Sequence, residues 1–180
     1  MAKRSPHPLT EGRAYQQQLL ALLGQDDPAA VQEATPASLR ALLEDAGSDL
    51  RQRPAAVEWS LLELLGHLAD AEMVMSGRYR WTISQEQPPL LGYDQDQWVA
   101  RLHHNDDEPG ELLVIFSAFR AANLRLWRRS SGDDRARVAV HAERGPESYE
   151  LMFRMLAGHD RFHLNQMHET LRQVRAAAAT

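Results

Sequence analysis

Apolar residues recur every three to four positions along five stretches of the chain, which is the pattern of helices that bury one face. These stretches cover residues 10–23, 35–50, 60–83, 108–129 and 146–175. Proline and glycine residues separate them, and no internal repeat is visible. Long helices that each carry an apolar face predict an all-α protein. We expect a four-helix bundle with a long connection between its second and third helices.

Two of the helices have specific start signals. We expect Thr35 to be the N-cap of the second helix, with Pro36 at the first helical position. Ser60 and Glu63 form a capping box at the start of the third helix, which favours a capping role for Glu63 over a role as ligand or base. The fourth helix is expected to bury Leu112, Ile115, Phe116, Phe119, Ala122 and Leu126.

Helical periodicity fails between Ser84 and Asn105, a connection that is longer than ordinary helix–helix loops and is either a crossover or a lid. The side chains in this connection that can border a pocket are Tyr93, Asp94, Trp98, His103 and His104. Tandem histidines in a polar loop, however, more often face solvent. Farther along, residues 137–141 are expected to be extended, and Gly145 and Pro146 to start the final helix.

A chain of 180 residues with 43 % hydrophobic content suits one domain with a single core. We expect this domain to span residues 1–180, with residues 1–9 and 176–180 frayed. The 20 Lys and Arg residues are outnumbered by 25 Asp and Glu residues, which argues against nucleic acid as a partner.

Composition also bears on location. There is no uninterrupted apolar span near 20 residues, so we expect no membrane crossing. Residues 1–8 are polar and no apolar segment follows them, so we expect no signal peptide and a cytoplasmic protein. The absence of cysteine excludes disulfides, thiolate ligands and a cysteine nucleophile.

The candidate chemistry lies in three histidines on apolar helix faces. His159 and His163 differ by about 40° around a helix and by about 6 Å along it, so both project from one face. Buried imidazoles need partners for both ring nitrogens, which hydrogen bonds in a core or a metal ion can supply. An H-x-x-x-H pair alone is a weak signal. His67, which also lies within a strongly apolar helix, is the best candidate for a third ligand, and three imidazoles can leave one tetrahedral position open, as in catalytic zinc sites.

Polar neighbours of the histidines have two interpretations. Asp160 and Gln166 can orient imidazoles or water beside an ion. Asp160 can equally be a surface acid that pairs with Arg161 or with a lysine or arginine elsewhere, and Asp70, one turn after His67, is open to the same two interpretations. His168 is excluded as a ligand because it lies about 140° around the helix from His163.

His141 precedes the final helix. We expect it to pack on a turn, although it can also border the pocket.

Together these segments resemble the DinB-like superfamily of four-helix bundles, which includes YfiT-like proteins proposed to be metal-dependent hydrolases, and thiol S-transferases. The residues that carry the resemblance are Trp59-Ser60, Gly66 to Glu72, Gly145 to Ser148, and Leu156 to Gln166, within a match over residues 19–174. Its most specific motif is a histidine followed about 90 residues later by H-x-x-x-H.

The resemblance implies that His67, His159 and His163 bind a divalent metal ion, with zinc or nickel expected, and that the protein is a homodimer. It also implies an enzyme that activates water or a low-molecular-weight thiol, such as bacillithiol or mycothiol, for attack on a small electrophile. Such a protein would be a thiol S-transferase or a hydrolase with a small-molecule substrate. The alternative is a non-catalytic, stress-associated metal-binding bundle.

Overall fold

The computed structural model describes residues 10–179. The expected fraying of residues 1–9 and of Thr180 lies outside the described residues. At the C-terminal end the last helix continues to Ala178, and its residues 176–178 are exposed. Within the described residues, no helix is both long and apolar enough to cross a membrane.

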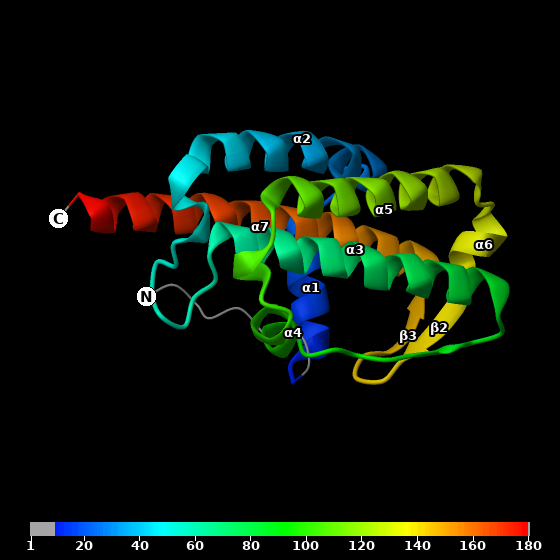
Figure 1. Cartoon of the computed structure of the whole chain (residues 1–180). Coiled ribbons are helices and arrows are strands. Elements are labelled where there is room, and N and C mark those ends of the chain that lie inside the picture. The colour runs from blue at the N-terminus through cyan, green and yellow to red at the C-terminus, as the bar shows by residue number, and fades with distance from the viewer. Residues whose placement is uncertain (1–9, 180) are drawn as a thin grey trace.

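Helices dominate the described chain, and a small sheet lies at one end (Figure 1). The elements are α1 (Gly12–Leu23), α2 (Pro28–Ala46), η1 (Gly47–Arg51), α3 (Leu61–Ser84), β1 (Pro89–Leu90), α4 (Gln95–Arg101), η2 (His104–Asp106), α5 (Pro109–Arg129), α6 (Gly132–Ala136), β2 (Val138–His141), β3 (Gly145–Ser148) and α7 (Tyr149–Ala178). The predicted all-α class and four-helix bundle are confirmed, and the three short strands are an addition to them.

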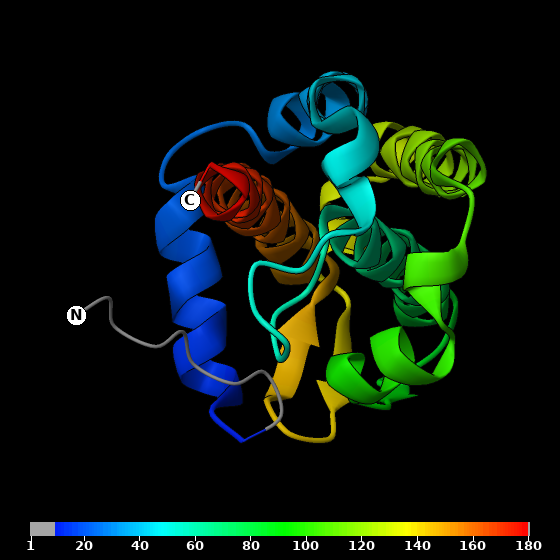
Figure 2. The same ribbon diagram turned by 60° about the vertical axis from the view of Figure 1, so that its left-hand side comes forward.

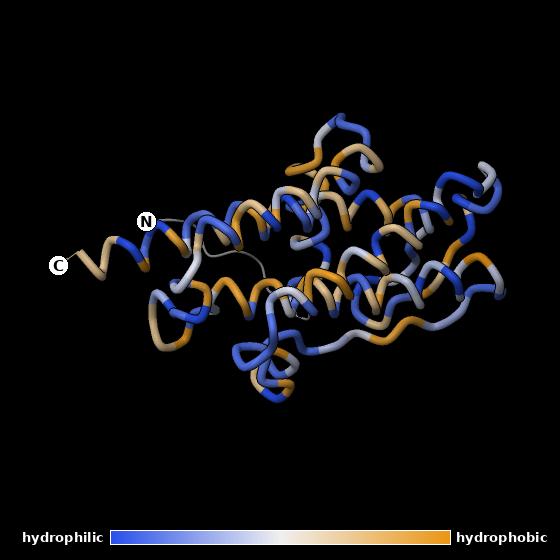
Figure 3. The backbone as a smooth tube through the Cα atoms, turned by 45° about the horizontal axis from the view of Figure 1, so that its top comes forward, coloured by the Kyte–Doolittle hydropathy of each residue, from blue (hydrophilic) through white to orange (hydrophobic). Residues whose placement is uncertain are grey.

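Four long helices, α2, α3, α5 and α7, run along the length of the molecule. Each packs against two others, in the order α2, α7, α3, α5 and back to α2. Helix α1 lies outside this ring and crosses α7 (Figure 2). Hydrophobic and hydrophilic residues alternate within the turns of the long helices (Figure 3), which is the pattern that buries one face of each.

Helix α2 begins earlier than the sequence analysis predicted. Asp27 is its N-cap, accepting a hydrogen bond from the backbone N of Ala29 at 3.0 Å, and Pro28 occupies the first position. The predicted start at Thr35 and Pro36 is therefore wrong. The same signal, a capping residue followed by proline, occurs eight residues earlier at Asp27 and Pro28. Pro36 lies inside the helix and cannot donate to the carbonyl of Gln32.

The buried face of α5 also differs from the prediction. It consists of Leu112, Leu113, Phe116, Arg120, Asn123, Leu124 and Trp127. Ile115, expected inside, is 46 % exposed, and Phe119, Ala122 and Leu126 are only half-buried. The prediction followed apolar residues alone, whereas Arg120 and Asn123 take inward positions because buried carboxylates pair with them.

Helix α3 starts as predicted. The hydroxyl of Ser60 accepts from the backbone N of Glu63 at 3.1 Å, and the carboxylate of Glu63 accepts from the backbone N of Ser60 at 2.8 Å. Arg53 also pairs with this carboxylate. Glu63 is therefore a capping residue, and both of its carboxylate oxygens are engaged, by the backbone N of Ser60 and by Arg53.

The small sheet joins the long connection to the end of the bundle. β1, inside that connection, pairs in parallel with β2, and β2 pairs with β3 as an antiparallel hairpin. Gly145, with φ +81°, takes the left-handed conformation that the turn between β2 and β3 requires. The predicted extended piece at residues 137–141 is confirmed, but the final helix starts at Tyr149, after Ser148 as N-cap, because Gly145 and Pro146 belong to β3.

Helices α1 and α7 touch backbone to backbone. A Cβ atom added at Gly158 of α7 would overlap the carbonyl oxygen of Leu19 and lie 2.6 Å from its carbonyl carbon. Glycine is therefore required at this crossing, where no side chain fits between the two helices.

Candidate metal centre

Three histidines on two neighbouring helices converge inside the bundle. His67 projects from the middle of α3, and His159 and His163 project from successive turns of α7. One ring nitrogen from each can be chosen so that all lie within 4.8 Å of one another. The Nε2 atoms of His67 and His159 are 3.1 Å apart. Two nitrogens bound to one tetrahedral ion at about 2.0–2.1 Å would be about 3.3 Å apart, so the observed separation fits a shared ion.

The ring nitrogens of these histidines are not all satisfied by protein groups. His67, His159 and His163 are 1 %, 8 % and 2 % exposed. Nδ1 of His163 lies 2.9 Å from Oε1 of Gln166, which can only accept, so Nδ1 carries the proton and Nε2 has a lone pair. The Nε2 atom of His163 and the Nδ1 atom of His159 are both buried without a hydrogen-bond partner among residues 10–179.

Burial lowers the pKa of all three imidazoles. For His163 the pKa falls to about 4 despite the hydrogen bond to Gln166. For His67 and His159 the pKa is well below its ordinary value because of burial and the neighbouring histidines. The rings are therefore neutral near pH 7, and neutral imidazole is the form that binds metal. Three neutral nitrogen donors suit zinc or nickel better than calcium or magnesium, which prefer oxygen.

Of the residues predicted to support the histidines, only Gln166 bonds to one of them. Asp160 is fully buried and bonds to Arg120 and Thr35. Its alternative interpretation as a surface acid paired with Arg161 is wrong, because Arg161 donates to backbone carbonyls at the end of α1 and to Asp26.

Asp70 accepts a hydrogen bond from a different histidine. Nε2 of His104 lies 2.8 Å from Asp70, and Nδ1 lies 2.8 Å from Asp107. These bonds raise the pKa of His104, the bond to Asp70 most strongly. The expectation that His104 faces solvent is wrong, since the residue is 6 % exposed. The available signal was Gly66 within a leucine-rich helix, because a Cβ there would lie 2.7 Å from Cβ of His104.

A buried ion cluster adjoins the histidines in the core. The guanidinium of Arg120 donates to both oxygens of Asp160, at 2.5 and 2.8 Å, and to Glu72 at 2.8 Å. It also donates to the carbonyl of Gln32 at 2.8 Å, the acceptor that Pro36 leaves free. Burial alone would lower the pKa of Arg120, but the two carboxylates raise it. This cluster therefore joins α2, α3, α5 and α7.

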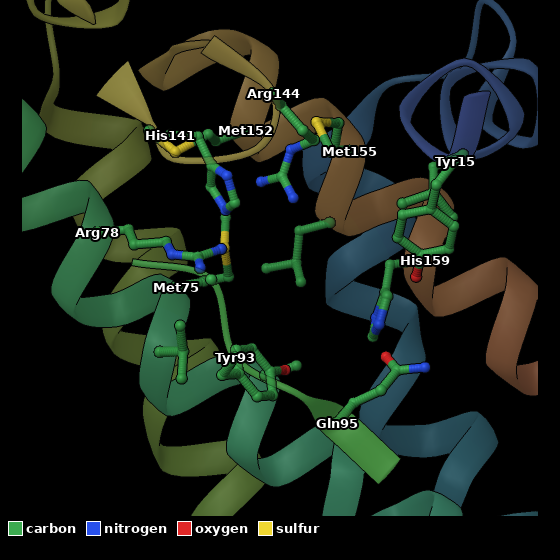
Figure 4. Close-up of a pocket in the computed structure, with 15 residues that line it drawn as sticks. Tyr15, Met75, Arg78, Tyr93, Gln95, His141, Arg144, Met152, Met155 and His159 are labelled. Carbon is green, nitrogen blue, oxygen red and sulfur yellow. The ribbon is translucent and has the colours of Figure 1, made fainter. Parts of the chain in front are cut away.

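A pocket opens beside His159 (Figure 4). Its cavity of about 90 Å³ is lined by residues of α1, α3, β2 and α7 and of the long connection. Tyr93 of that connection lines it as expected, whereas Asp94, Trp98, His103 and His104 are not among the lining residues. His141 also lines the cavity rather than packing only on a turn.

Acidification is expected to destabilise the metal-free protein. Burial lowers the pKa of His163 to about 4, compared with about 6.5 for an exposed histidine. Between these values the unfolded chain binds a proton that the folded chain does not. The stabilisation by neutral His163 is therefore complete above pH 6.5 and is lost as pH falls to about 4, a loss of about 3 kcal/mol.

The free energy of unfolding can be measured with urea, in the presence of a chelator, at several pH values between about 4 and 6.5. Replacing His163 with Gln should flatten the dependence, whereas His168→Gln, at an exposed position, should leave it unchanged. Equal slopes for the wild type and His163→Gln would show that the buried imidazole does not control acid stability.

Comparisons with known proteins agree with this architecture. Residues 32–167 match the model of the DinB superfamily. A protein of Oceanobacillus iheyensis named "Putative metal-dependent hydrolase" is 29 % identical over 107 residues, or 59 % of this chain. The match spans 61 % of that relative, less than two thirds of its length.

A solved structure shares the fold over nearly the whole chain. It is YfiT from Bacillus subtilis, described as "a probable metal-dependent hydrolase with an unusual four-helix bundle topology". The TM-score is 0.72, and the match covers 96 % of this chain and 94 % of YfiT at 19 % identity. At this identity the likeness establishes the fold alone.

Proposed function

Because the chain belongs to the DinB superfamily, we propose that it is a metal-dependent enzyme that acts on a small molecule bound beside three histidine ligands. His67, His159 and His163 hold the ion in this proposal. The observation that carries it is the convergence of buried ring nitrogens next to a cavity, one of which, Nε2 of His163, has no protein partner. A core that used these histidines only for packing would satisfy such atoms with hydrogen bonds.

Each residue near the centre has a distinct role in this proposal. His67 fixes the ion to α3, while His159 and His163 fix it to α7. Gln166 holds the ring of His163 in the tautomer whose Nε2 is available. A bound divalent ion supplies Lewis acidity, which polarises a carbonyl or lowers the pKa of a water or thiol toward neutrality.

The carboxylates close to the histidines in sequence are all engaged elsewhere. Asp70 pairs with His104, and Glu72 and Asp160 pair with Arg120. None of these three is therefore placed as a general base. A reaction that depends mainly on the ion to activate its nucleophile fits this arrangement, and both hydrolysis and transfer to a low-molecular-weight thiol meet that condition.

The relatives described as hydrolases support hydrolysis as the first activity to test. Protein purified without a histidine tag is expected to contain about one divalent ion per chain by elemental analysis. Addition of zinc or nickel after chelation should restore turnover of an ester panel, or of electrophiles supplied with bacillithiol or mycothiol. Stoichiometric metal without turnover in either panel would contradict the enzyme proposal.

The second candidate is a metal-binding bundle without turnover. The engagement of Asp70, Glu72 and Asp160 favours it, since no general base stands among them. The two panels decide between the candidates, because a non-catalytic protein would bind the ion and leave every electrophile unchanged. Homodimer formation and a cytoplasmic location stay predictions.

A further inference from the structure

The side of the pocket away from His159 contains an arginine without an acidic partner. Arg78 is 6 % exposed. Its Nη2 donates to the carbonyl of Leu91 at 2.5 Å, and its Nη1 contacts the sulfur of Met75 at 3.8 Å. Among residues 10–179, no carboxylate forms an ion pair with it. Buried charged groups are almost always paired, as Arg120 is here. Arg78 therefore lacks the anionic partner that a buried guanidinium normally has.

A buried histidine beside the same cavity also lacks a partner. His141 is 2 % exposed, and its Nδ1 lies 2.8 Å from a carboxylate oxygen of Glu143. This carboxylate holds the proton of the neutral ring on Nδ1. The Nε2 atom, which is buried without a hydrogen-bond partner among the described residues, therefore has a lone pair and can accept a hydrogen bond from a ligand. Figure 4 shows the rings and guanidinium groups of His141, Arg78 and Arg144 directed toward the cavity from one side, with His159 on the other.

Arg144 adds positive charge without competing for the same anion. Its Nε and Nη2 donate to the two oxygens of Glu147, at 2.5 and 2.9 Å, and Glu147 is fully buried. The pKa of Arg78 is lowered by burial and by the nearby charge of Arg144, and the charges of Glu147 and Glu143, which form no ion pair with it, offset only part of this. Two guanidinium groups near one cavity, with only one of them paired, create a site that an anion would stabilise.

Between these groups and His159 the lining is mostly apolar. Met75, Met152 and Met155 contribute thioether side chains, which adapt to irregular apolar ligands. A ligand that fits the whole cavity therefore has a charged end, a short apolar body and a second end next to His159. The small cavity limits it to a few carbon atoms between the two ends.

We propose that Arg78 forms a subsite for the carboxylate group of a small organic acid derivative, whose reactive group lies beside His159. A carboxylate matches the planar guanidinium of Arg78 and accepts two hydrogen bonds from it. The identification of this acid as the substrate rests on the proposed metal-dependent activity. The binding of the carboxylate rests only on the pocket and needs no metal ion.

The test is therefore made on metal-free protein, kept with a chelator, and uses isothermal titration calorimetry. Pentanoate is expected to bind saturably, and pentanamide, its neutral analogue, at least about tenfold more weakly. Inorganic phosphate separates a requirement for an organic carboxylate from general anion binding. The subsite is wrong if pentanoate shows no saturable binding or binds no better than pentanamide, and phosphate binding tighter than pentanoate would overturn the choice of a carboxylate.

Variants assign the binding to the proposed side chain. Arg78→Gln is expected to weaken pentanoate binding at least about tenfold, while Arg78→Lys keeps part of it because the charge remains. Arg101→Gln removes an exposed arginine at the end of α4 and should leave binding unchanged. Folding of each variant is checked by circular dichroism. If Arg78→Gln and Arg78→Lys both fold and bind like the wild type, Arg78 is not the anchor.

Failure of the subsite and failure of the proposed activity give different results. Pentanoate binding by the metal-free protein, together with inactivity of the metal-loaded protein, would support the subsite and contradict the enzyme proposal. Metal-dependent turnover of neutral substrates, with no binding of pentanoate, would contradict the subsite and support the enzyme proposal.

Discussion

Alanine in place of His163 is expected to remove most of the metal-binding affinity. The Nε2 atom that this change deletes is buried, and its lone pair has no protein partner among the described residues. Its loss leaves two imidazoles, which hold an ion as an incomplete site. The affinity should therefore fall by more than the roughly 10–100-fold typical of changes outside the ligand set. His67→Ala and His159→Ala should do the same, as measured by competition with a chromophoric chelator.

Two further variants calibrate this result. Gln166→Ala removes only the acceptor that orients His163, so its effect should lie within the roughly 10–100-fold range. His168→Ala removes an exposed histidine from the same helix and should leave the affinity unchanged. Stoichiometric binding by folded His163→Ala protein, at wild-type affinity, would mean that the ion is held by other groups.

Replacement of Arg120 with leucine is expected to cause the largest loss of stability. Asp160 and Glu72 are each at most 1 % exposed and would lose the cation that compensates their charge. Removing one partner of a buried ion pair typically costs about 3–5 kcal/mol. Burial already raises the pKa of Glu72, so this group would take up a proton at higher pH once Arg120 is gone. Urea unfolding at about pH 7 would measure the loss.

The matched control is Arg128→Leu, which removes an exposed guanidinium that pairs with exposed Glu33. Surface ion pairs of this kind contribute about 0–1 kcal/mol. A triple variant with leucine at positions 72, 120 and 160 should recover much of the stability, because it leaves no buried charge unpaired. A loss below about 1 kcal/mol for Arg120→Leu would contradict a structural role for the cluster.

The parts of the structure that the sequence predicted depend on local patterns. The capping box at Ser60 and Glu63 spans a single turn, so it is visible without knowledge of the fold. The spacing of His159 and His163 places them together on any helix. The position of His67 in an apolar helix and the resemblance to a known family both made it a candidate third ligand, but only the packing of α3 against α7 shows that it meets the other two.

The parts that were missed depend on contacts between distant segments. Arg120 at an inward position of α5 has a reason only when Asp160 and Glu72 face it from other helices. His104 is buried because the long connection folds back onto α3. The groups around Arg78 and His141 come together through the pairing of β1 with β2, which no local pattern in either segment indicates.

The crossing of α1 and α7 has a consequence for the choice of ion. Gly158 holds α7 against the backbone of Leu19, and Asp160 is bonded by Arg120 and Thr35, so the residues on both sides of His159 are fixed. Helix α7 therefore has little freedom to roll and move its imidazoles away from His67. A larger ion would need longer bonds and a displacement of whole helices, which dense packing resists. In the proposed centre, the size of the ion would thus be restricted by the contact between two backbones as well as by the chemistry of the nitrogen donors.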